Sequence, residues 1–537
     1  MKNERCDILL IGYEEGENLG LRSIISFLAR HDFYARFESY IPERKSKILA
    51  ACISLQPDIV GFSLIFQRFL PDFAELLSFL RENGIGSHFT MGGHFPSVES
   101  RLVMDYIPEL DSIVRCEGEY TVLDLLKHIK TGMPLENIPG LTYRSRSETI
   151  VNTPRRLIAD LDELPFPARD KCSFKIMNIG VSTILSSRGC FYDCSFCSIR
   201  QFYKEAYGPG RRARSPGNVV DEMEALFNNM GTRIFIFEDD DFYARNKIQK
   251  QWVIEFLNEL KKRKLDREIG WRISCRIDDI EEDILKQMVA AGLLCVYIGI
   301  ESGNNASLRV YNKKYDSATV LRSVAILEKL HLYYEFGFMI LNPYCTMDTI
   351  REDIEFLKAL GRSGLALAQF TKMVPYAGTP VEKLLKDEGR LTGAPEAPDY
   401  GYPDPRIALL EHFLHKAFSH RNFNPEGLVE KLRYMKFYIS LLGRYHPHIY
   451  ASDNSAEKIE KLIIEANHEF LEKSSMAVRV MSERDENAII RLWPVLNELI
   501  RETRAFEMAM TQEIDKWYYK LENEIRFELS PGVSCRV

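Results

Sequence analysis

Three cysteines in one short segment constrain this chain more than any other feature. They stand in Cys190-Phe-Tyr-Asp-Cys194-Ser-Phe-Cys197. Thiolates at this spacing can hold three corners of a four-iron four-sulfur cluster and leave the fourth iron open to a small molecule. A zinc site is the alternative, but it needs four ligands, usually as two pairs, and no second Cys or His pair follows nearby in the sequence. A disulfide fits an odd triplet less well. We therefore predict that Cys190, Cys194 and Cys197 bind a cluster.

Composition and charge describe an ordinary globular chain with several domains. Its 537 residues are enough for several separate cores. The net charge of -7 is spread without long blocks, so there is no basic stripe for nucleic acid and no polybasic membrane anchor. No stretch approaches the ~18 apolar residues of a membrane-spanning helix. The eleven cysteines, mostly single, suit a reducing compartment. We expect a cytoplasmic protein with no nucleic-acid partner and no membrane span.

The first part of the chain alternates strand and helix patterns. Apolar runs at Asp7–Gly12, Asp58–Ser63 and His88–Gly93 read as buried strands, and Leu21–His31 and Phe69–Asn83 read as amphipathic helices. This alternation predicts a parallel sheet with helices on both faces. Sheets of this kind bind ligands beyond the carboxyl ends of their strands, so we expect a ligand site in the loops there.

A second alternating series begins near residue 179. Six strand candidates follow: Val181–Ser187, Arg233–Glu238, Gly270–Arg276, Leu294–Glu301, Tyr334–Leu341 and Leu365–Met373. Six such units with helices between them predict a partial barrel, whose chemistry gathers at the carboxyl ends of the strands. The polar residues Asp239, Asp240, Arg276 and Glu301 fall at those ends, as does Cys190.

The expected fold class is therefore α/β with four segments. A Rossmann-like domain covers 1–136, a proline-broken linker 137–178, and a partial (βα)6 TIM barrel 179–391. Helical periodicity dominates 392–537, where one apolar stripe contains Ile459, Leu462, Ile463, Ala466 and Phe470. We expect this helical domain to cap the substrate side of the barrel.

Several motifs together resemble the cobalamin-binding branch of the radical S-adenosylmethionine enzymes, over roughly residues 2–385. Besides the cysteine segment they are Arg212–Glu222, Phe237–Phe242, Trp271–Arg276, Gly299–Gly303 with Tyr311–Lys314, and Pro375–Pro380. The resemblance implies three cofactors: a 4Fe-4S cluster, S-adenosylmethionine (SAM) and cobalamin.

The resemblance also implies a set of SAM contacts. Asp239 or Asp240 would face the ammonium, Arg276 the carboxylate or ribose, and Glu301 the ribose hydroxyls or the amine, while Phe196 is the usual aromatic before the last cysteine. Opposite charges on neighbouring strand ends suit a ligand that carries both an ammonium and a carboxylate.

Structural roles compete with these assignments. The aspartates could form a solvated acidic turn or a helix N-terminus. Arg276 could pair internally with Asp278 or Asp239, and Glu301 could merely precede a helix.

The same family places a corrinoid on the N-terminal sheet. Many cobalamin proteins ligate cobalt through a histidine after the first strand, but Glu17 stands at that place here. No histidine bond to cobalt of that kind can form here, and the family often leaves the lower face of the corrin open or water-bound. His94 is a candidate neighbour of the corrin. The residues that resemble the corrinoid surface are Gly61, Ser63, Gly92, Gly93, His94 and Glu117. Small residues there let the backbone approach a flat macrocycle.

The function that this resemblance implies is a cobalamin-dependent radical C-methyltransferase acting on an unactivated carbon. A non-methylating rearrangement or oxidative cyclisation with the same cofactors is the first alternative, and a corrinoid-binding sensor with an inert barrel is the alternative from another class. The expected partners are a small-molecule or peptide substrate and an electron donor such as flavodoxin or ferredoxin.

Overall fold

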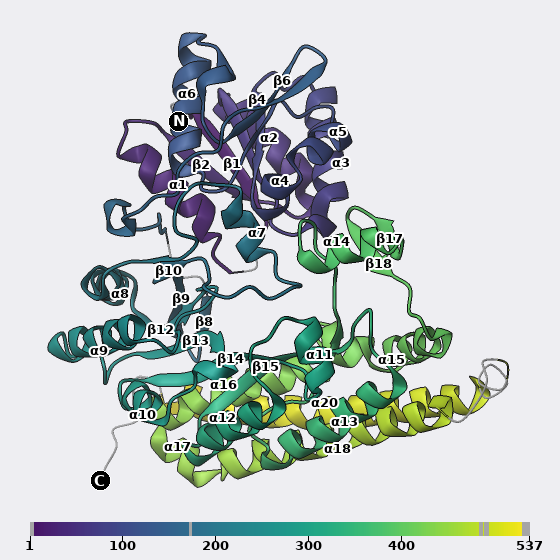
Figure 1. The fold of residues 1–537 in the computed structure, drawn as a ribbon. Helices are drawn as coiled ribbons and strands as arrows, with labels where there is room; N and C mark the ends of the chain where they lie inside the picture. Colours follow the sequence, from purple (N-terminus) through teal and green to yellow (C-terminus); the bar gives the residue numbers. More distant parts are fainter. Residues whose placement is uncertain (1–4, 15, 171–173, 483–486, 488–492, 529–537) are drawn as a thin grey trace.

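A computed structural model describes residues 5–14, 16–170, 174–482, 487 and 493–528. Figure 1 shows three parts: an N-terminal α/β domain at the top, a second α/β sheet in the middle, and long C-terminal helices along the bottom. This arrangement confirms the predicted α/β class with a Rossmann-like domain, a partial barrel and a helical C-terminal region.

The N-terminal sheet has seven strands in the order β2-β1-β3-β4-β5-β6-β7. The first five pair in parallel, and β6 and β7 are added antiparallel to β5. Their bounds are β1 Ile8–Gly12, β2 Ala35–Ser39, β3 Ile59–Ser63, β4 His88–Gly92, β5 Ser112–Val114, β6 Leu141–Ser145 and β7 Glu148–Val151. The domain boundaries stay predictions, but β6 and β7 extend this sheet past residue 136.

Helices cover both faces of this sheet because its central strands are apolar on both sides. On β1, Leu9 and Ile11 join one core with α2, α3 and α5, whereas Ile8 and Leu10 join another with α1 and α6. The helices are α1 Leu19–Ala29, α2 Lys45–Leu55, α3 Leu70–Glu82, α4 His94–Val98, α5 Ser100–Tyr106 and α6 Glu119–Thr131.

The second sheet is an open partial barrel with the strand order β16-β15-β14-β13-β12-β9-β8. All neighbours pair in parallel except β8 and β9. The strands are β8 Phe174–Ile176, β9 Ile179–Ile184, β12 Thr232–Phe237, β13 Gly270–Arg276, β14 Leu293–Glu301, β15 Tyr333–Leu341 and β16 Thr371–Lys372. A short antiparallel pair, β10 Ser187–Arg188 and β11 Arg212–Ala213, flanks the cysteine segment.

The prediction of a last barrel strand over Leu365–Met373 is wrong for most of this segment, because only Thr371–Lys372 pairs with β15. Side chains from the C-terminal helices bind the backbone before it. Asn467 accepts from Ala368 N at 2.7 Å and donates to Ala366 O at 2.9 Å. Arg421 Nη1 donates to Ala368 O at 3.1 Å. These bonds replace the strand ladder there.

The helices that surround the barrel follow the predicted alternation. They are α7 Ile199–Lys204, α8 Pro216–Met230, α9 Lys247–Lys262, α10 Glu282–Ala290, α11 Asn305–Val310, α12 Ser317–Lys329, α13 Met347–Leu360 and α14 Pro380–Asp387. The C-terminal helices are α15 Pro405–Phe423, α16 Leu428–Tyr445, α17 Pro447–Ser452, α18 Ser455–Ser482 and α20 Trp493–Glu528.

Helix α16 lies at the amino-terminal ends of the barrel strands. Tyr445 Oη donates to the carbonyls of Arg233 and Glu268, and Lys436 Nζ donates to Tyr334 O at 2.8 Å, all near strand starts. The cysteine segment is at the opposite, carboxyl end. Helix α16 therefore lies away from the cysteine segment, with its apolar face packed on the barrel, and a substrate-side cap formed by the C-terminal helices stays a prediction.

A hairpin outside the predicted elements connects the barrel to the N-terminal domain. Its strands are β17 Leu391–Ala394 and β18 Ala397–Tyr400, and Figure 1 shows it beside α14, reaching up toward the N-terminal domain. The buried side chain of Gln67 donates to Pro395 O at 2.7 Å and accepts from Ala377 N at 3.2 Å. These bonds fix the hairpin against the N-terminal domain.

Among the described residues, no helix combines the length and apolar character that crossing a bilayer requires.

Candidate functional site

The cysteine segment forms a loop between β10 and α7 at the carboxyl end of the barrel. Burial is the main cause that raises the pKa of Cys190 to about 12 and that of Cys197 to about 11, and the neighbouring thiols contribute to both shifts. The three sulfurs thus lie close enough to interact. In the described part of the chain, no His, Cys, Asp and Glu side chains converge as ligands of one ion would. Thiolates on a cluster each bind a different iron, so they need not converge.

Arg276, at the end of β13, contacts this loop directly. Its Nη1 lies 3.6 Å from Cys194 Sγ, and its guanidinium stands 3.8 Å from the centre of the Tyr192 ring. The internal ion pair with Asp278 is also present, at 2.9 Å. One face of Arg276 is therefore held by Asp278 while the other reaches the cluster loop. Tyr192 was not predicted as a site residue.

The three consecutive aspartates after β12 have different environments. Asp239 is buried and accepts hydrogen bonds from Ser186 N at 3.0 Å and Ser186 Oγ at 2.6 Å, so it holds the adjacent loop. Asp240 accepts from Gly189 N at 2.9 Å, and burial raises its pKa to about 6. Asp241 was not predicted as a site residue. Its Oδ2 lies 4.0 Å from Cys190 Sγ, and its buried Oδ1 has no hydrogen-bond donor among the described residues.

Glu301 ends β14 with a left-handed backbone, φ 67°. A side-chain-bearing residue rarely takes this conformation, and such residues often occur at functional sites. Its carboxylate pairs with the buried Lys313 at 3.0 Å. Lys313 in turn lies 5.4 Å from the centre of the Phe196 ring. Glu301 and Phe196, predicted separately, are thus brought together through Lys313, which was not predicted as a site residue although it lies in one of the quoted motifs.

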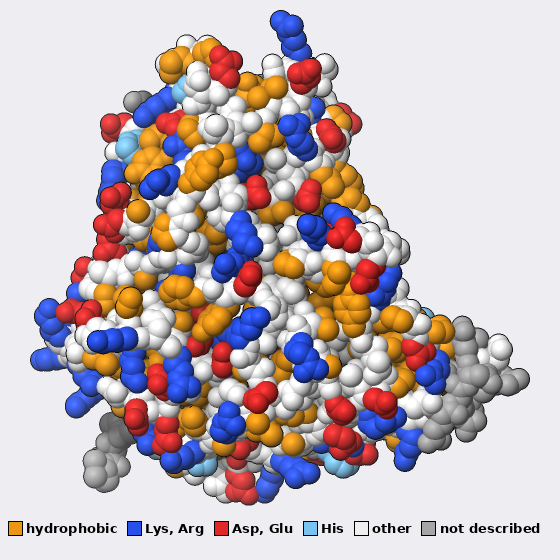
Figure 2. Space-filling model, in the orientation of Figure 1, with side chains coloured by type: hydrophobic (Ala, Val, Ile, Leu, Met, Phe, Trp, Pro, Cys, Tyr) orange, Lys and Arg blue, Asp and Glu red, His pale blue; other side chains and the backbone are white. Residues whose placement is uncertain are grey.

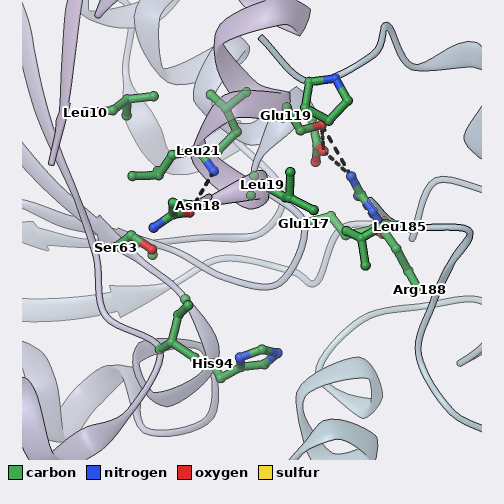
Figure 3. Close-up of a pocket in the computed structure, with 18 of the residues that line it drawn as sticks. Leu10, Asn18, Leu19, Leu21, Ser63, His94, Glu117, Glu119, Leu185 and Arg188 are labelled. Carbon is green, nitrogen blue, oxygen red and sulfur yellow. Dashed lines mark hydrogen bonds and ion pairs between the residues drawn. The ribbon is translucent and has the colours of Figure 1, made fainter. Parts of the chain in front are cut away.

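A cavity of about 680 Å³ lies between the carboxyl ends of the two sheets. In Figure 3, Asn18 and Ser63 stand on its N-terminal side and Leu185 and Arg188 on its barrel side. The predicted residues that line it are Gly61, Ser63, Gly92, Gly93, His94, Glu117 and Asp240. The predicted residues Cys190, Cys194, Cys197, Phe196, Asp239, Arg276 and Glu301 are not in its lining.

The turn after β4 shapes the N-terminal wall of this cavity. Gly93 has φ 115°, and a Cβ there would lie 2.2 Å from Leu64 O, so only glycine fits. The next residue, His94, lines the cavity, and its ring lies 4.3 Å from the Phe202 ring. Burial lowers the pKa of His94 to about 4, which keeps the imidazole neutral at physiological pH.

Glu17 also reaches the cavity, at the place where a histidine ligand would stand. Its Oε2 accepts from Thr183 N at 2.9 Å and Thr183 Oγ1 at 3.0 Å on β9, and it forms a buried ion pair with Arg169. Arg169 also pairs with Glu222 of α8 at 3.1 Å. Glu17 thus connects the N-terminal domain to the barrel.

A second buried ion-pair group joins the domains beside the cysteine segment. Arg188 pairs with Glu117 at 3.0 Å and with Glu119 at 2.6 Å, and Arg212 pairs with Glu117 at 2.9 Å. Glu117 was predicted as a corrinoid contact, whereas Arg188, Glu119 and Arg212 were not predicted as site residues. Arg212 begins one of the quoted motifs, which was the available signal, but only the tertiary structure shows that these residues pair.

The residues present fit the three predicted cofactors. The three thiols share one loop beside Arg276, as a cluster with an open iron requires. The unsatisfied Asp241 Oδ1, next to this loop, suits a cationic group such as the ammonium of SAM. The cavity between the two sheets, floored by Gly61, Gly92 and Gly93, suits a flat macrocycle.

Comparisons with known proteins agree with this geometry. Residues 184–357 match the model of the radical SAM superfamily, and residues 8–126 match that of the B12 binding domain. An uncharacterized methyltransferase of Pyrococcus horikoshii is 30% identical over 60% of this chain and 68% of its own length. An anaerobic magnesium-protoporphyrin IX monomethyl ester cyclase of Cereibacter sphaeroides is 27% identical over 62% of this chain, which spans 54% of that relative.

A solved structure has the same fold over nearly the whole chain. The cobalamin-dependent S-adenosylmethionine radical enzyme OxsB, with aqua-cobalamin and S-adenosylmethionine bound, covers 99% of this chain and 82% of its own, with a TM-score of 0.70 and 17% identity. Both family models, the methyltransferase relative and this fold lead to one assignment. The chain belongs to the cobalamin-binding radical SAM enzymes, whose cofactors are a 4Fe-4S cluster, SAM and cobalamin.

Proposed function

We propose that the protein is a cobalamin-dependent radical SAM C-methyltransferase that acts on an unactivated carbon of a small-molecule or peptide substrate. The observation that carries this proposal is the cavity between the two sheets. On one side it is lined by the glycines predicted to face the corrinoid, and on the other by Asp240, which lies beside the cluster loop. A methyl donor on one wall and a radical source on the other would then share one space. We further propose a cytoplasmic location.

When bound, the cluster and SAM supply a 5′-deoxyadenosyl radical, and cobalamin supplies the methyl group. The chain contributes binding and orientation. Cys190, Cys194 and Cys197 would hold the cluster, and Asp241 would accept the ammonium of SAM through its unsatisfied Oδ1. Arg276, held by Asp278, would keep its orientation while it contacts the carboxylate or ribose. Unlike Asp241, Asp239 would act indirectly, by fixing the loop at Ser186.

On the other wall, this chain's residues would receive the corrinoid. The glycines at the ends of β3 and β4 allow close approach, and the neutral His94 would adjoin the macrocycle. At the position where many cobalamin proteins have a histidine ligand, this chain has Glu17, whose carboxylate pairs with Arg169. These features support cobalamin binding without a histidine from the loop after β1.

A non-methylating reaction is the second candidate, because the relatives include a cyclase as well as a methyltransferase. The two candidates differ in what they consume. A methylase uses one SAM for the radical and another for the methyl group, whereas a rearrangement or cyclisation needs no methyl donor. A sensor with an inert barrel is disfavoured by the family assignment together with the full cysteine triplet.

The test is product analysis after anaerobic turnover with deuteromethyl SAM and cell extract. We expect 5′-deoxyadenosine and S-adenosylhomocysteine to form in parallel with a product that gains one labelled methyl group. Asp241→Asn should lower both nucleoside products, and Asp387→Asn, an exposed aspartate at the end of α14, is the matched control. Deoxyadenosine without S-adenosylhomocysteine or labelled product would refute the methylase and favour the second candidate.

A further inference from the structure

The cluster loop reaches the protein surface at Phe191 and Asp193. The Phe191 residue is 47% exposed and the Asp193 side chain 51% exposed, whereas Cys190, Cys194 and Cys197 are partly buried. Phe191 thus presents an apolar ring at the surface directly beside the first cysteine of the segment. It gives a partner protein a short approach to the cluster.

Cationic side chains surround Phe191. Arg200 of α7 donates to Phe191 O at 3.1 Å, and the guanidinium of Arg211 stands 4.9 Å from the centre of the Phe191 ring. Lys204, also on α7, lies 3.9 Å from the Asp193 carboxylate and has a side chain that is 51% exposed. In Figure 2, Lys and Arg side chains are visible over the region where Figure 1 places α7.

Two further cations extend this group on neighbouring loops. Arg245, 62% exposed, follows β12, and its backbone N–H and the Tyr192 hydroxyl both donate to Asp279. Exposed Lys314 donates to Asn312, whose amide donates to the backbone of the cluster loop. We call the cations that lie on or beside the cluster loop and its contacting loops the basic rim; its members are Arg200, Lys204, Arg211, Arg245 and Lys314.

The basic rim has more cations than the carboxylates that form ion pairs with it, and Asp239 and Asp241, which also attract Arg211, are buried. The carboxylates paired with its members are Asp193, shared by Arg200 and Lys204, and Glu281, beside Arg245. The cations therefore outnumber these carboxylates, although the whole chain carries a net charge of -7. Positive charge beside an exposed aromatic side chain can steer an oppositely charged protein to this surface, where the aromatic ring can then pack against it.

We propose that the basic rim and Phe191 form the docking site for an acidic one-electron carrier protein. The proposal rests on the proposed function, because a cluster that cleaves SAM must first be reduced. One electron would pass from the reduced carrier to the oxidised cluster, so that the carrier is oxidised by one electron and the cluster reduced by one, with no bond made or broken. The complementary charge selects an acidic carrier over a basic one.

The test measures the rate of cluster reduction itself, as bleaching of the cluster's visible absorbance in anaerobic stopped-flow. The full-length reconstituted protein is mixed with reduced flavodoxin, an acidic carrier, or with reduced methyl viologen, a small cation. The variant is Lys204→Glu with Arg245→Glu, which changes two exposed rim cations. We expect at least about a tenfold slower reaction with flavodoxin at low ionic strength, and a smaller difference at high salt.

The rate of cluster reduction by methyl viologen should not fall in the variant. It should stay equal or rise, because the cation no longer meets positive charge. The matched control is Lys261→Glu with Arg267→Glu, which makes the same change in net charge at the other end of the barrel. Neutralisation by Lys204→Gln with Arg245→Gln should give an intermediate flavodoxin rate.

Unchanged flavodoxin rates in the rim variants, or equal slowing in the control, would refute docking at the rim. Slowing with both reductants in both rim pairs would also refute it, because the effect would then lie in the loop itself. A cluster that is reduced normally but does not cleave SAM would refute the proposed function and leave the docking result standing.

Discussion

Replacing Arg169 by methionine should weaken the contact between the N-terminal domain and the barrel. Arg169 and its partners Glu17 and Glu222 have side chains that are 5% exposed or less. Glu222 would keep Arg214, at 2.6 Å. Glu17 would lose this cation, while the backbone and hydroxyl of Thr183 would still donate hydrogen bonds to it. The substitution therefore removes one cation from a buried carboxylate.

The expected loss of stability follows from breaking this one buried ion pair. Breaking a buried ion pair from one side costs about 3–5 kcal/mol. Because Thr183 still donates to Glu17, we take the lower end, about 3 kcal/mol. In a transiently open state the carboxylate is hydrated, so the whole cost falls on the closed state. At 1.4 kcal/mol for each factor of ten, the open population should rise about 100-fold.

Limited proteolysis of the apo protein measures this population, since cleavage tracks the open fraction when closing is faster than cutting. Thermolysin suits the assay because it cuts beside apolar residues such as those in 157–166, and not at arginine. We expect cleavage in this segment to be about 100 times faster in Arg169→Met. The matched control is Arg30→Met, which removes one exposed hydrogen bond to Glu163 O and should change the rate less than about fivefold.

A second substitution tests the cause. Adding Glu17→Gln to Arg169→Met removes the buried charge that lost this cation, so the double variant should recover about tenfold of the lost protection. Wild-type cleavage rates in Arg169→Met, or a double variant that is cut faster than the single one, would refute the reasoning.

Three further predictions concern the cofactors and pH. Changing Cys190, Cys194 and Cys197 to alanine should abolish binding of about four irons per chain; iron and sulfide analysis after anaerobic reconstitution checks this. His94→Ala should leave the electron paramagnetic resonance spectrum of bound cob(II)alamin without nitrogen splitting, as in the wild type; splitting that only the wild type shows would make His94 a ligand. Burial raises the pKa of Asp353 from 3.8 to about 7, so the folded state binds more protons across that window and stability falls as pH rises through it. Asp353→Asn should flatten this dependence in urea unfolding.

The sequence predicted the two sheets because their strands are long apolar runs at regular intervals. Gly270–Arg276 was predicted with the bounds that β13 has in the structure. It missed β2, Ala35–Ser39, because this edge strand is only partly buried and carries Arg36 and Glu38. It also predicted a full strand at Leu365–Met373, where the apolar run is buried but its backbone bonds to Asn467 and Arg421. Asn467 and Arg421 lie 99 and 53 residues beyond Ala368 in the chain, and no local pattern reveals them.

The candidate site shows the same limit. Sequence placed acidic residues at the end of the second barrel strand, but it could not say which of three consecutive aspartates faces a ligand. Asp239 is occupied by Ser186, whereas Asp241 has an unsatisfied oxygen. Their different surroundings come from the loop that carries Gly189 and Cys190, so they depend on tertiary structure. The sequence did not predict Lys313 for a similar reason. Its ion pair with Glu301 depends on the left-handed backbone conformation of Glu301, which the sequence pattern does not show.

The position of the ion pairs explains why the two domains form one site. The carboxyl ends of both sheets face the same cavity, and the N-terminal side brings Glu17, Glu117 and Glu119 to it. Buried carboxylates need charged partners, and these come from outside the N-terminal domain, as Arg169 and Arg188. Separating the two sides would break these buried ion pairs. The same contacts that neutralise the carboxylates therefore hold the two domains together around the cavity, as the proposed transfer of a methyl group from cobalamin to a substrate would require.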